Sequence, residues 1–255
     1  MSRAMEITRI FDLLPHYKST YKFKEDAIAG KEDGVWVKYS IDQYIEKADN
    51  ISYGLLKLGV KPGDKIASIS SNRPEWNFID MGIMQIGAVH VPIYPTISET
   101  DYQYILKHSE VKFIFVCCPD LLRKIEHLLP GIENIRGLYT FDKIDNTRHI
   151  SELEELGKDN PAPEELERIR ASINPEDLAT IIYTSGTTGV PKGVMLSHSN
   201  ILSNDFDTRD IFPLDETCKG VSYLPLCHVY ERTNVYVYQY KGVSLYYAES
   251  LATIA

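Results

Sequence analysis

Residues 178–193 read LATIIYTSGTTGVPKG, in which a short apolar run leads into a loop dense in glycine and hydroxyl groups. The run Leu178–Ile182 has the length and composition of a buried strand. Gly186, Gly189 and Gly193 let the loop backbone take positive φ and approach a ligand closely. Consecutive N–H groups in such a loop form an anion-binding concavity. The stretch therefore predicts a buried strand that ends in an anion-binding loop.

The side chains of this loop indicate that the anion is a phosphate. Hydroxyl donors come from Thr184, Ser185, Thr187 and Thr188, and Lys192 adds a cation that can reach phosphate oxygens. A plain Gly/Thr-rich turn between two strands is the alternative interpretation. We favour phosphate binding because the apolar strand, the hydroxyl groups and the lysine coincide within one loop.

The loop differs from a Walker A loop, whose pattern is G-x-x-x-x-G-K-[ST]. Counted from Gly186, Pro191 holds the place of the second glycine, and Gly193 follows Lys192 where Ser or Thr is required. The residues 194–196 that follow predict a strand, whereas a Walker A loop opens a helix. These departures argue against a P-loop kinase or NTPase.

Apolar strands alternate with amphipathic helices along the rest of the chain. Ser40 and Gln43 form a capping box at the start of one helix, whose apolar face continues to Leu58. Strands are expected at 65–70, 88–94, 111–117, 136–141, 178–184, 194–197, 220–224 and 243–248. Unbroken apolar strands joined by helices predict an α/β fold, with largely parallel sheets that helices cover on both faces.

The segment 151–175 is charged and proline-containing, yet Leu153 and Leu166 are among its apolar anchors. We interpret it as a helical connection on the surface. The predicted organisation is a first α/β lobe at 1–175, including this connection, and the start of a second lobe at 176–255. The second lobe carries the phosphate loop and is incomplete.

Composition narrows the function classes. The 255 residues include 27 basic and 36 acidic side chains, with a formal net charge of -9. An acidic protein repels phosphate backbones, so we expect no nucleic-acid partner. No stretch of 18 apolar residues predicts a membrane span, although peripheral membrane contact and the oligomeric state stay open.

The four cysteines show neither disulfide-framework nor zinc-ligand spacing. This usage is typical of a reducing compartment and indicates a cytoplasmic protein. Cys117 and Cys118 end an apolar strand, and we interpret both as buried packing residues.

Two motifs carry a family resemblance. The run YTSGTTGVPKGVMLSHSN (183–200) resembles the phosphate-binding signature of acyl-adenylate-forming enzymes. The run YLPLCHVYER (223–232) is similar to the next motif, in the form LPL-x-H-x-x-ER typical of long-chain fatty acyl-CoA synthetases. Agreement extends to SSNRPEW (70–76), GAVHVPIYPT (87–96) and YAES (247–250). The resemblance covers essentially the whole chain.

The resemblance implies a fold, a reaction and substrates. The fold is the N-terminal large-domain part of the acyl-adenylate-forming fold. A fatty acid and ATP give acyl-AMP and pyrophosphate, and coenzyme A then displaces AMP to give the thioester. Mg²⁺ offsets the charge of the triphosphate. The partners implied are therefore the fatty acid, ATP and CoA.

The resemblance also assigns site residues. His228 matches a position near the carboxylate and the acyl tunnel, and the alternative is a helix-start histidine satisfied by backbone. Thr184 additionally matches a position near the metal. Cys227 needs no nucleophilic role in this chemistry. The positions that match the ATP-phosphate loop are Thr184, Ser185, Gly186, Thr187, Thr188, Gly189 and Lys192.

Other polar residues near the motifs receive structural interpretations. Asn72, Arg73 and Glu75 stand at a helix start, where capping is the expected role. The pair Glu231 and Arg232 fits a helical ion pair as well as a functional role. His198 is expected to cap or pack beside the helix from about Ser199 and receives no functional role. We expect packing, not substrate contact, for Tyr230, Tyr236, Tyr238 and Tyr240.

The resemblance further predicts that the chain is truncated. Members of the superfamily carry, further downstream, an aromatic-Gly-x-Thr-Glu segment, a ribose-binding aspartate and a small domain with a catalytic lysine. The sequence has no counterpart of these and stops at Ala255, soon after Ser250 opens a predicted helix. We expect an N-terminal part of a fatty acid–CoA ligase that has no complete catalytic set and is inactive alone. The alternative is a natural short relative that binds a nucleotide or acyl group without catalysis.

Overall fold

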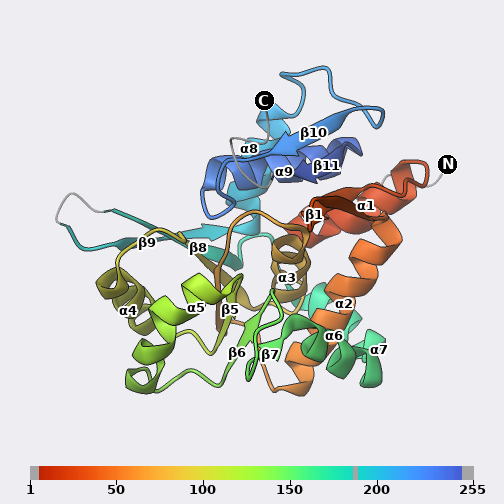
Figure 1. Cartoon of the computed structure of the whole chain (residues 1–255). Coiled ribbons are helices and arrows are strands. Elements are labelled where there is room, and N and C mark those ends of the chain that lie inside the picture. Colours follow the sequence, from red (N-terminus) through yellow and green to blue (C-terminus); the bar gives the residue numbers. More distant parts are fainter. Residues whose placement is uncertain (1–5, 186–188, 249–255) are drawn as a thin grey trace.

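Two β-sheets form the framework of the chain, and a computed structural model describes residues 6–185 and 189–248 (Figure 1). The larger sheet has the order β7-β6-β5-β3-β4-β8-β9, and the smaller has the order β10-β11-β1-β2. The strands of the larger sheet are β3 (Lys65–Ile69), β4 (Val89–Ile93), β5 (Phe113–Val116), β6 (Gly137–Thr140), β7 (Arg148–His149), β8 (Leu178–Thr184) and β9 (Lys192–Ser197). Those of the smaller sheet are β1 (Ile28–Glu32), β2 (Val35–Tyr39), β10 (Lys219–Ser222) and β11 (Ser244–Tyr247).

Helices connect the strands and cover the sheets. In Figure 1, α4 and α5 lie on the left of the larger sheet, α2, α6 and α7 lie on the right, and α8 and α9 lie beside the smaller sheet. The α-helices are α1 (Leu13–Thr20), α2 (Ile41–Lys57), α3 (Pro74–Met84), α4 (Glu99–His108), α5 (Pro119–Ile125), α6 (Ile150–Asp159), α7 (Pro163–Ser172), α8 (His198–Thr208) and α9 (Val229–Lys241). The 3₁₀-helices are η1 (Ile10–Asp12) and η2 (Glu126–Gly131).

The predicted α/β class is confirmed. Strands β3 to β8 pair in parallel, as do β10, β11 and β1. Every residue of β4 and β5 is buried, which explains why these strands lack an apolar–polar alternation. The capping box of α2 is also present, because Ser40 accepts from the Gln43 amide and Gln43 accepts from the Ser40 amide.

Both sheets take strands from both sides of residue 175. Strand β8 pairs with β4, and β11 pairs with β1. The boundary expected there does not coincide with a division between the sheets, and the two-lobe organisation stays a prediction. The connection 151–175 is helical as expected, and it forms α6 and α7. Gly157 lets α6 approach α2 closely, since a Cβ there would lie 1.8 Å from the Asn50 carbonyl oxygen.

Several elements were not expected from the sequence. The strands β1 and β2 form an antiparallel hairpin, in which Asp33 and Gly34 take φ of 50° and 78°. An Asp-Gly pair with positive φ at both positions is a known hairpin signal, so this element was readable. The short helix α1 and the two-residue strand β7 were also missed. The helix expected from Ser250 lies outside the described residues.

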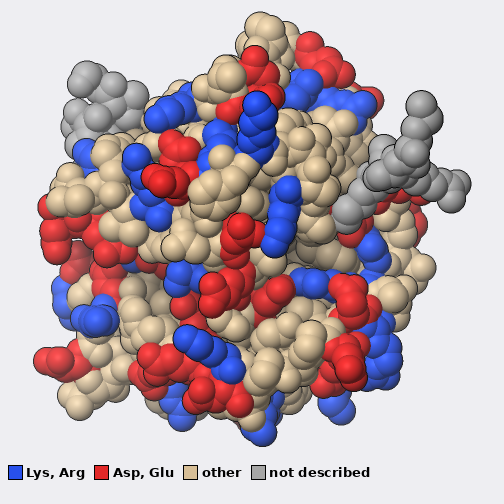
Figure 2. Space-filling view, turned by 90° about the vertical axis from the view of Figure 1, so that its right-hand side faces the viewer, with Lys and Arg blue, Asp and Glu red and all other residues tan. Residues whose placement is uncertain are grey.

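Charged side chains of both signs interleave on the face that Figure 2 shows. Within the described ranges, no helix has the length and apolarity that crossing a membrane requires.

One carboxyl group inside the fold has no compensating partner. Asp205 on α8 is 2 % exposed, and neither of its carboxyl oxygens has a hydrogen-bond partner among the described residues. Burial raises the pKa of Asp205 to about 8. The folded state therefore holds this carboxyl protonated at neutral pH, whereas the unfolded chain ionises it.

The Asp205 carboxyl should make folding pH-dependent. Its folded pKa lies above the unfolded value of 3.8, so the free energy of unfolding falls as pH rises from about 4 to about 8. Asp205→Asn removes this pH dependence and raises the free energy of unfolding at pH 8 by roughly a few kcal/mol. Urea unfolding at pH 4, 6 and 8 measures the difference, with the exposed Asp207→Asn on the same helix as control. Equal pH slopes for the two variants would contradict the buried, uncompensated carboxyl.

Candidate functional site

The predicted phosphate loop connects two antiparallel strands. Thr184 at the end of β8 lies opposite Lys192 at the start of β9, so the hairpin brings these two side chains to the same end. Thr184, Ser185, Gly189 and Lys192 are all exposed. The strand after the loop confirms the departure from the Walker A context. The predicted residues Gly186, Thr187 and Thr188 lie outside the described residues.

The glycines of the hairpin serve two different purposes. Gly189 takes a φ of 80°, which an L side chain rarely adopts. Gly193 lies within β9, and a Cβ there would lie 2.8 Å from the Ile181 side chain. Its role is therefore clearance across the hairpin, not the positive φ that the sequence suggested. Below the loop, the Tyr183 hydroxyl and His108 Nδ1 share a hydrogen bond of 2.7 Å, which ties β8 to α4.

The described side chains at the ends of the predicted phosphate loop are not engaged with other described residues. The Lys192 ammonium forms no ion pair within the described part of the chain, and Thr184 and Ser185 are exposed. No group of three His, Cys, Asp or Glu in residues 6–185 and 189–248 could hold a metal ion. The position of Thr184 near a metal therefore stays a prediction.

His228 stands at the N-cap of α9 and is exposed. Its backbone N–H donates to the Pro225 carbonyl at 3.0 Å, but its imidazole makes no capping hydrogen bond. The ring instead packs edge-on against Tyr94, with 5.2 Å between the ring centroids. Among the described residues, no hydrogen bond or ring contact joins His228 to the phosphate loop.

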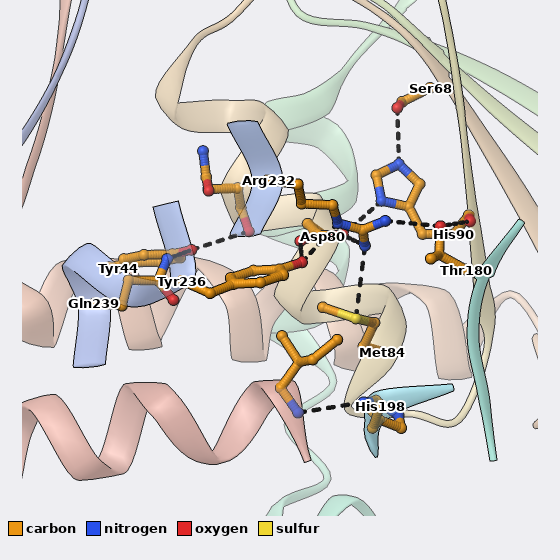
Figure 3. A network of polar contacts seen from close by, with 12 residues as sticks. Tyr44, Ser68, Asp80, Met84, His90, Thr180, His198, Arg232, Tyr236 and Gln239 are labelled. Carbon is orange, nitrogen blue, oxygen red and sulfur yellow. Dashed lines mark hydrogen bonds and ion pairs between the residues drawn. The ribbon is translucent and has the colours of Figure 1, made fainter. Parts of the chain in front are cut away.

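A buried polar network lies between the strand that carries the loop and the helix that carries His228 (Figure 3). Its centre is Arg232 on α9, which is 0 % exposed. The guanidinium donates from Nη1 to the Thr180 hydroxyl at 2.7 Å, from Nε to the Tyr236 hydroxyl at 2.7 Å, and from Nη2 to the Asp80 carboxylate. Thr180 lies on β8 and Asp80 on α3, so one side chain joins α9 to both elements.

The Asp80 carboxylate is held in its charged form inside the protein. Burial favours protonation, but the Arg232 guanidinium and the hydrogen bonds from His90 and Tyr236 outweigh it, so the pKa of Asp80 is lowered. Tyr236 donates its hydroxyl proton to the second carboxylate oxygen at 2.6 Å. Arg232 and Asp80 thus form a buried ion pair, and further hydrogen bonds occupy other acceptor positions of the carboxylate.

His90 extends the network to β3. Its Nδ1 lies 2.6 Å from the Asp80 carboxylate, and its Nε2 lies 2.7 Å from the Ser68 hydroxyl. Burial lowers the pKa of His90 despite the neighbouring carboxylate, so the neutral ring donates to Asp80 and accepts from Ser68. The order Ser–His–Asp matches that of a hydrolytic triad. Ser68 is only 1 % exposed, within a sheet strand, so no substrate reaches it and the arrangement is structural.

The structure corrects several interpretations of neighbouring residues. Glu231 and Arg232 do not pair with each other, because the Ser222 hydroxyl donates to Glu231 and Arg232 binds Asp80. Asn72 does not cap α3, and its amide bonds to the 222–226 segment. Arg73 occupies the N-cap position of α3 without a capping bond. Asp80 lies in no quoted motif, and His90 lies in the stretch 87–96 but received no role. Both were missed because their partners lie far apart in the sequence.

The burial of the cysteines at 117 and 227 argues against a catalytic role for them. Cys227 is buried, which raises the pKa of its thiol to about 12. Its thiol therefore stays protonated at neutral pH, which does not suit a nucleophile. Cys117 is buried as expected, whereas Cys118 is partly exposed.

A separate cavity of about 910 Å³ opens at the carboxyl ends of strands from both sheets. Its walls include residues 71–75 after β3, residues 141–143 after β6, and Tyr247 at the end of β11. None of the described residues predicted for the phosphate or acyl site lines this cavity. Asn72 lines this cavity and also bonds to the 222–226 segment.

Comparison with known proteins gives the family. The sequence profile described as AMP-binding enzyme matches residues 18–254. The chain therefore belongs to the AMP-binding enzyme family, as the two motifs indicated.

Relatives and solved structures agree with this assignment. Fatty acyl-CoA synthetase A of Dictyostelium discoideum is 36% identical over 226 residues, covering 82% of this chain and 32% of the relative. The peroxisomal long chain acyl-CoA synthetase 7 of Arabidopsis thaliana is 34% identical over 257 residues, covering 94% and 36%. A long-chain-fatty-acid-CoA ligase from Archaeoglobus fulgidus has the same fold, with a TM-score of 0.78 at 21% identity, covering 96% of this chain and 47% of that structure. The chain spans about a third of the length of the curated relatives it matches.

The Arg232–Asp80 pair should dominate the stability of this region. Arg232→Met leaves the Asp80 carboxylate buried without its counter-charge, which costs about 3–5 kcal/mol of unfolding free energy. The double variant Arg232→Met/Asp80→Asn should recover part of this loss, because no unpaired charge remains. Urea unfolding measures both, and Arg123→Met, from an exposed Arg–Asp pair, should cost less than about 1 kcal/mol. Similar losses for Arg232→Met and Arg123→Met would contradict the assigned role.

Proposed function

We propose that this chain supplies the phosphate-binding part of an ATP-dependent ligase that joins a long-chain fatty acid to coenzyme A. The observation that carries the proposal is the end of the β8–β9 hairpin, where the exposed Thr184 and Ser185 lie beside Lys192, which forms no ion pair with a described residue. Membership of the AMP-binding enzyme family supports a nucleotide as the ligand. The names of the relatives support a fatty acid as the second substrate.

The reaction proceeds in two displacements. The fatty-acid carboxylate attacks the α-phosphorus of ATP, and the bond to pyrophosphate breaks. The thiolate sulfur of coenzyme A then attacks the acyl carbon, and AMP leaves. Both steps depend on orienting the reacting groups and stabilising charge on phosphate oxygens, more than on a protein nucleophile.

The loop residues act on the triphosphate. The Thr184 and Ser185 hydroxyls donate hydrogen bonds to phosphate oxygens, and Lys192 neutralises charge on the departing pyrophosphate. Gly186, Thr187, Thr188 and Gly189 complete the loop in this proposal. Thr184 would help to hold a Mg²⁺ bound with the nucleotide, and the metal would offset part of the remaining negative charge.

In this proposal, His228 lies in the part of the site that binds the fatty acid. Large apolar side chains near it in sequence are exposed, among them Tyr223, Leu224, Val229 and Tyr230, the last of which is 66% exposed. Such a surface suits an acyl chain. The His228 imidazole, which no hydrogen bond engages within the described part of the chain, is free to interact with the carboxylate.

A nucleotide-binding test can be made with the 255-residue chain itself. Lys192→Ala should weaken the binding of ATP by about five- to tenfold, because one charge-assisted contact is lost. Isothermal titration with Mg·ATP at low ionic strength measures the affinity. Lys158→Ala, which removes another exposed lysine, is the matched control and should change little. Equal affinities for the two variants would remove Lys192 from the phosphate site.

An exchange assay tests whether the 255-residue chain holds a complete catalytic set. The 255-residue chain should show no fatty-acid-dependent exchange between ATP and pyrophosphate, because its sequence has no aromatic-Gly-x-Thr-Glu segment. Radiolabelled pyrophosphate exchange with palmitate measures this. Robust exchange would contradict the expected lack of a complete catalytic set, whereas ATP binding without exchange agrees with both candidate functions.

A further inference from the structure

The side-chain amide of Asn72 joins the two sheets at the second motif. Asn72 follows β3 of the larger sheet, and Ser222 ends β10 of the smaller one. The Asn72 Nδ2 group donates to the Leu224 carbonyl at 2.6 Å and to the Ser222 hydroxyl at 3.1 Å. Its Oδ1 accepts from the Leu226 N–H at 3.0 Å. Three bonds thus hold a segment that is about 150 residues away in sequence.

The pattern of these bonds requires an amide. The two protons of Nδ2 meet two oxygens, and Oδ1 meets an N–H, so donors and acceptors match on both sides of the group. A carboxylate of the same shape could still accept from Leu226. It would also place an oxygen against the Leu224 carbonyl oxygen, which is repulsive. Asn72→Asp is therefore a variant that changes the bonding without changing the packing.

The contact continues into the first turn of α9. The Ser222 hydroxyl accepts from Asn72 and donates to the Glu231 carboxylate, which is 5% exposed. The next residue, Arg232, is fixed to Asp80 in the buried network. The start of α9 is thus held from two directions, while His228 at its N-cap stays exposed.

We propose that Asn72 is a positioning residue that fixes the segment 224–228 and thereby the place of His228. The inference rests on the proposed function, in which His228 faces the fatty-acid carboxylate. The bonds of Asn72 fall on Leu224 and Leu226, within four residues of His228, and the turn between them closes with the His228 N–H on Pro225. Asn72 acts through this turn and touches no reacting atom.

Local mobility tests the positioning role in the 255-residue chain. ¹⁵N relaxation should show rigid amides at Leu226, Cys227 and His228 in the unmodified chain, with order parameters near 0.85. In Asn72→Asp, they should fall to about 0.6–0.7, while amides of α3 stay rigid. Asn160→Asp is the matched control, because the Asn160 amide also donates to a backbone carbonyl, that of Leu156, at 2.9 Å. Unchanged order parameters in Asn72→Asp would overturn the inference.

Fatty-acid binding separates this inference from the proposed function. Titration with the fluorescent fatty acid cis-parinaric acid should show affinity reduced several-fold in both His228→Ala and Asn72→Asp. If His228→Ala weakens binding and Asn72→Asp does not, the positioning role is wrong and the acyl site stands. If neither variant changes the affinity, the acyl role of His228 is wrong, and the relaxation measurement alone decides whether Asn72 fixes the segment.

Discussion

The ion pair between Arg232 and Asp80 is the interaction on which the arrangement of the candidate site depends. Arg232 stands four residues after His228 on α9, and its guanidinium also bonds to Thr180 on the strand that leads into the phosphate loop. The two motifs therefore share one anchor, although no described contact joins the loop to His228. Asp80 holds that anchor against α3, and His90 connects it to the middle of the larger sheet.

A buried ion pair is not in itself a source of stability, because both charges lose their hydration. This one is accompanied by hydrogen bonds from Tyr236 and His90 to the carboxylate, and from the guanidinium to Thr180. A network whose members are satisfied has one low-energy arrangement, whereas alternatives leave a charge unpaired. Its effect is to define how α9 sits on the sheet. Ser222 of the smaller sheet adds a second restraint on the same helix, because its hydroxyl donates to Glu231 of α9 and accepts from Asn72.

The sequence predicted those parts of the structure that depend on neighbours along the chain. The apolar strand 178–182, the capping box at Ser40 and the glycine-rich loop are local patterns, and the Asp33-Gly34 turn could have been read in the same way. The roles of Asp80, His90 and Asn72 were not predictable, because each depends on partners brought together by the fold. Capping was a reasonable expectation for Asn72 from its position before a helix, but a polar contact across 150 residues took precedence.

Strand β8 acts as a fixed spacer between the anchor and the loop. Thr180 contacts Arg232, and Thr184 begins the loop, so four residues of extended chain separate them by about 13 Å. An extended strand cannot lengthen, and its side chains alternate between faces. The number of residues in this interval therefore determines two things: how far the loop lies from Arg232, and on which face of the strand its first side chain lies. Adding a single residue would move the loop outward and turn its first hydroxyl to the opposite face, even if every residue of both motifs were kept.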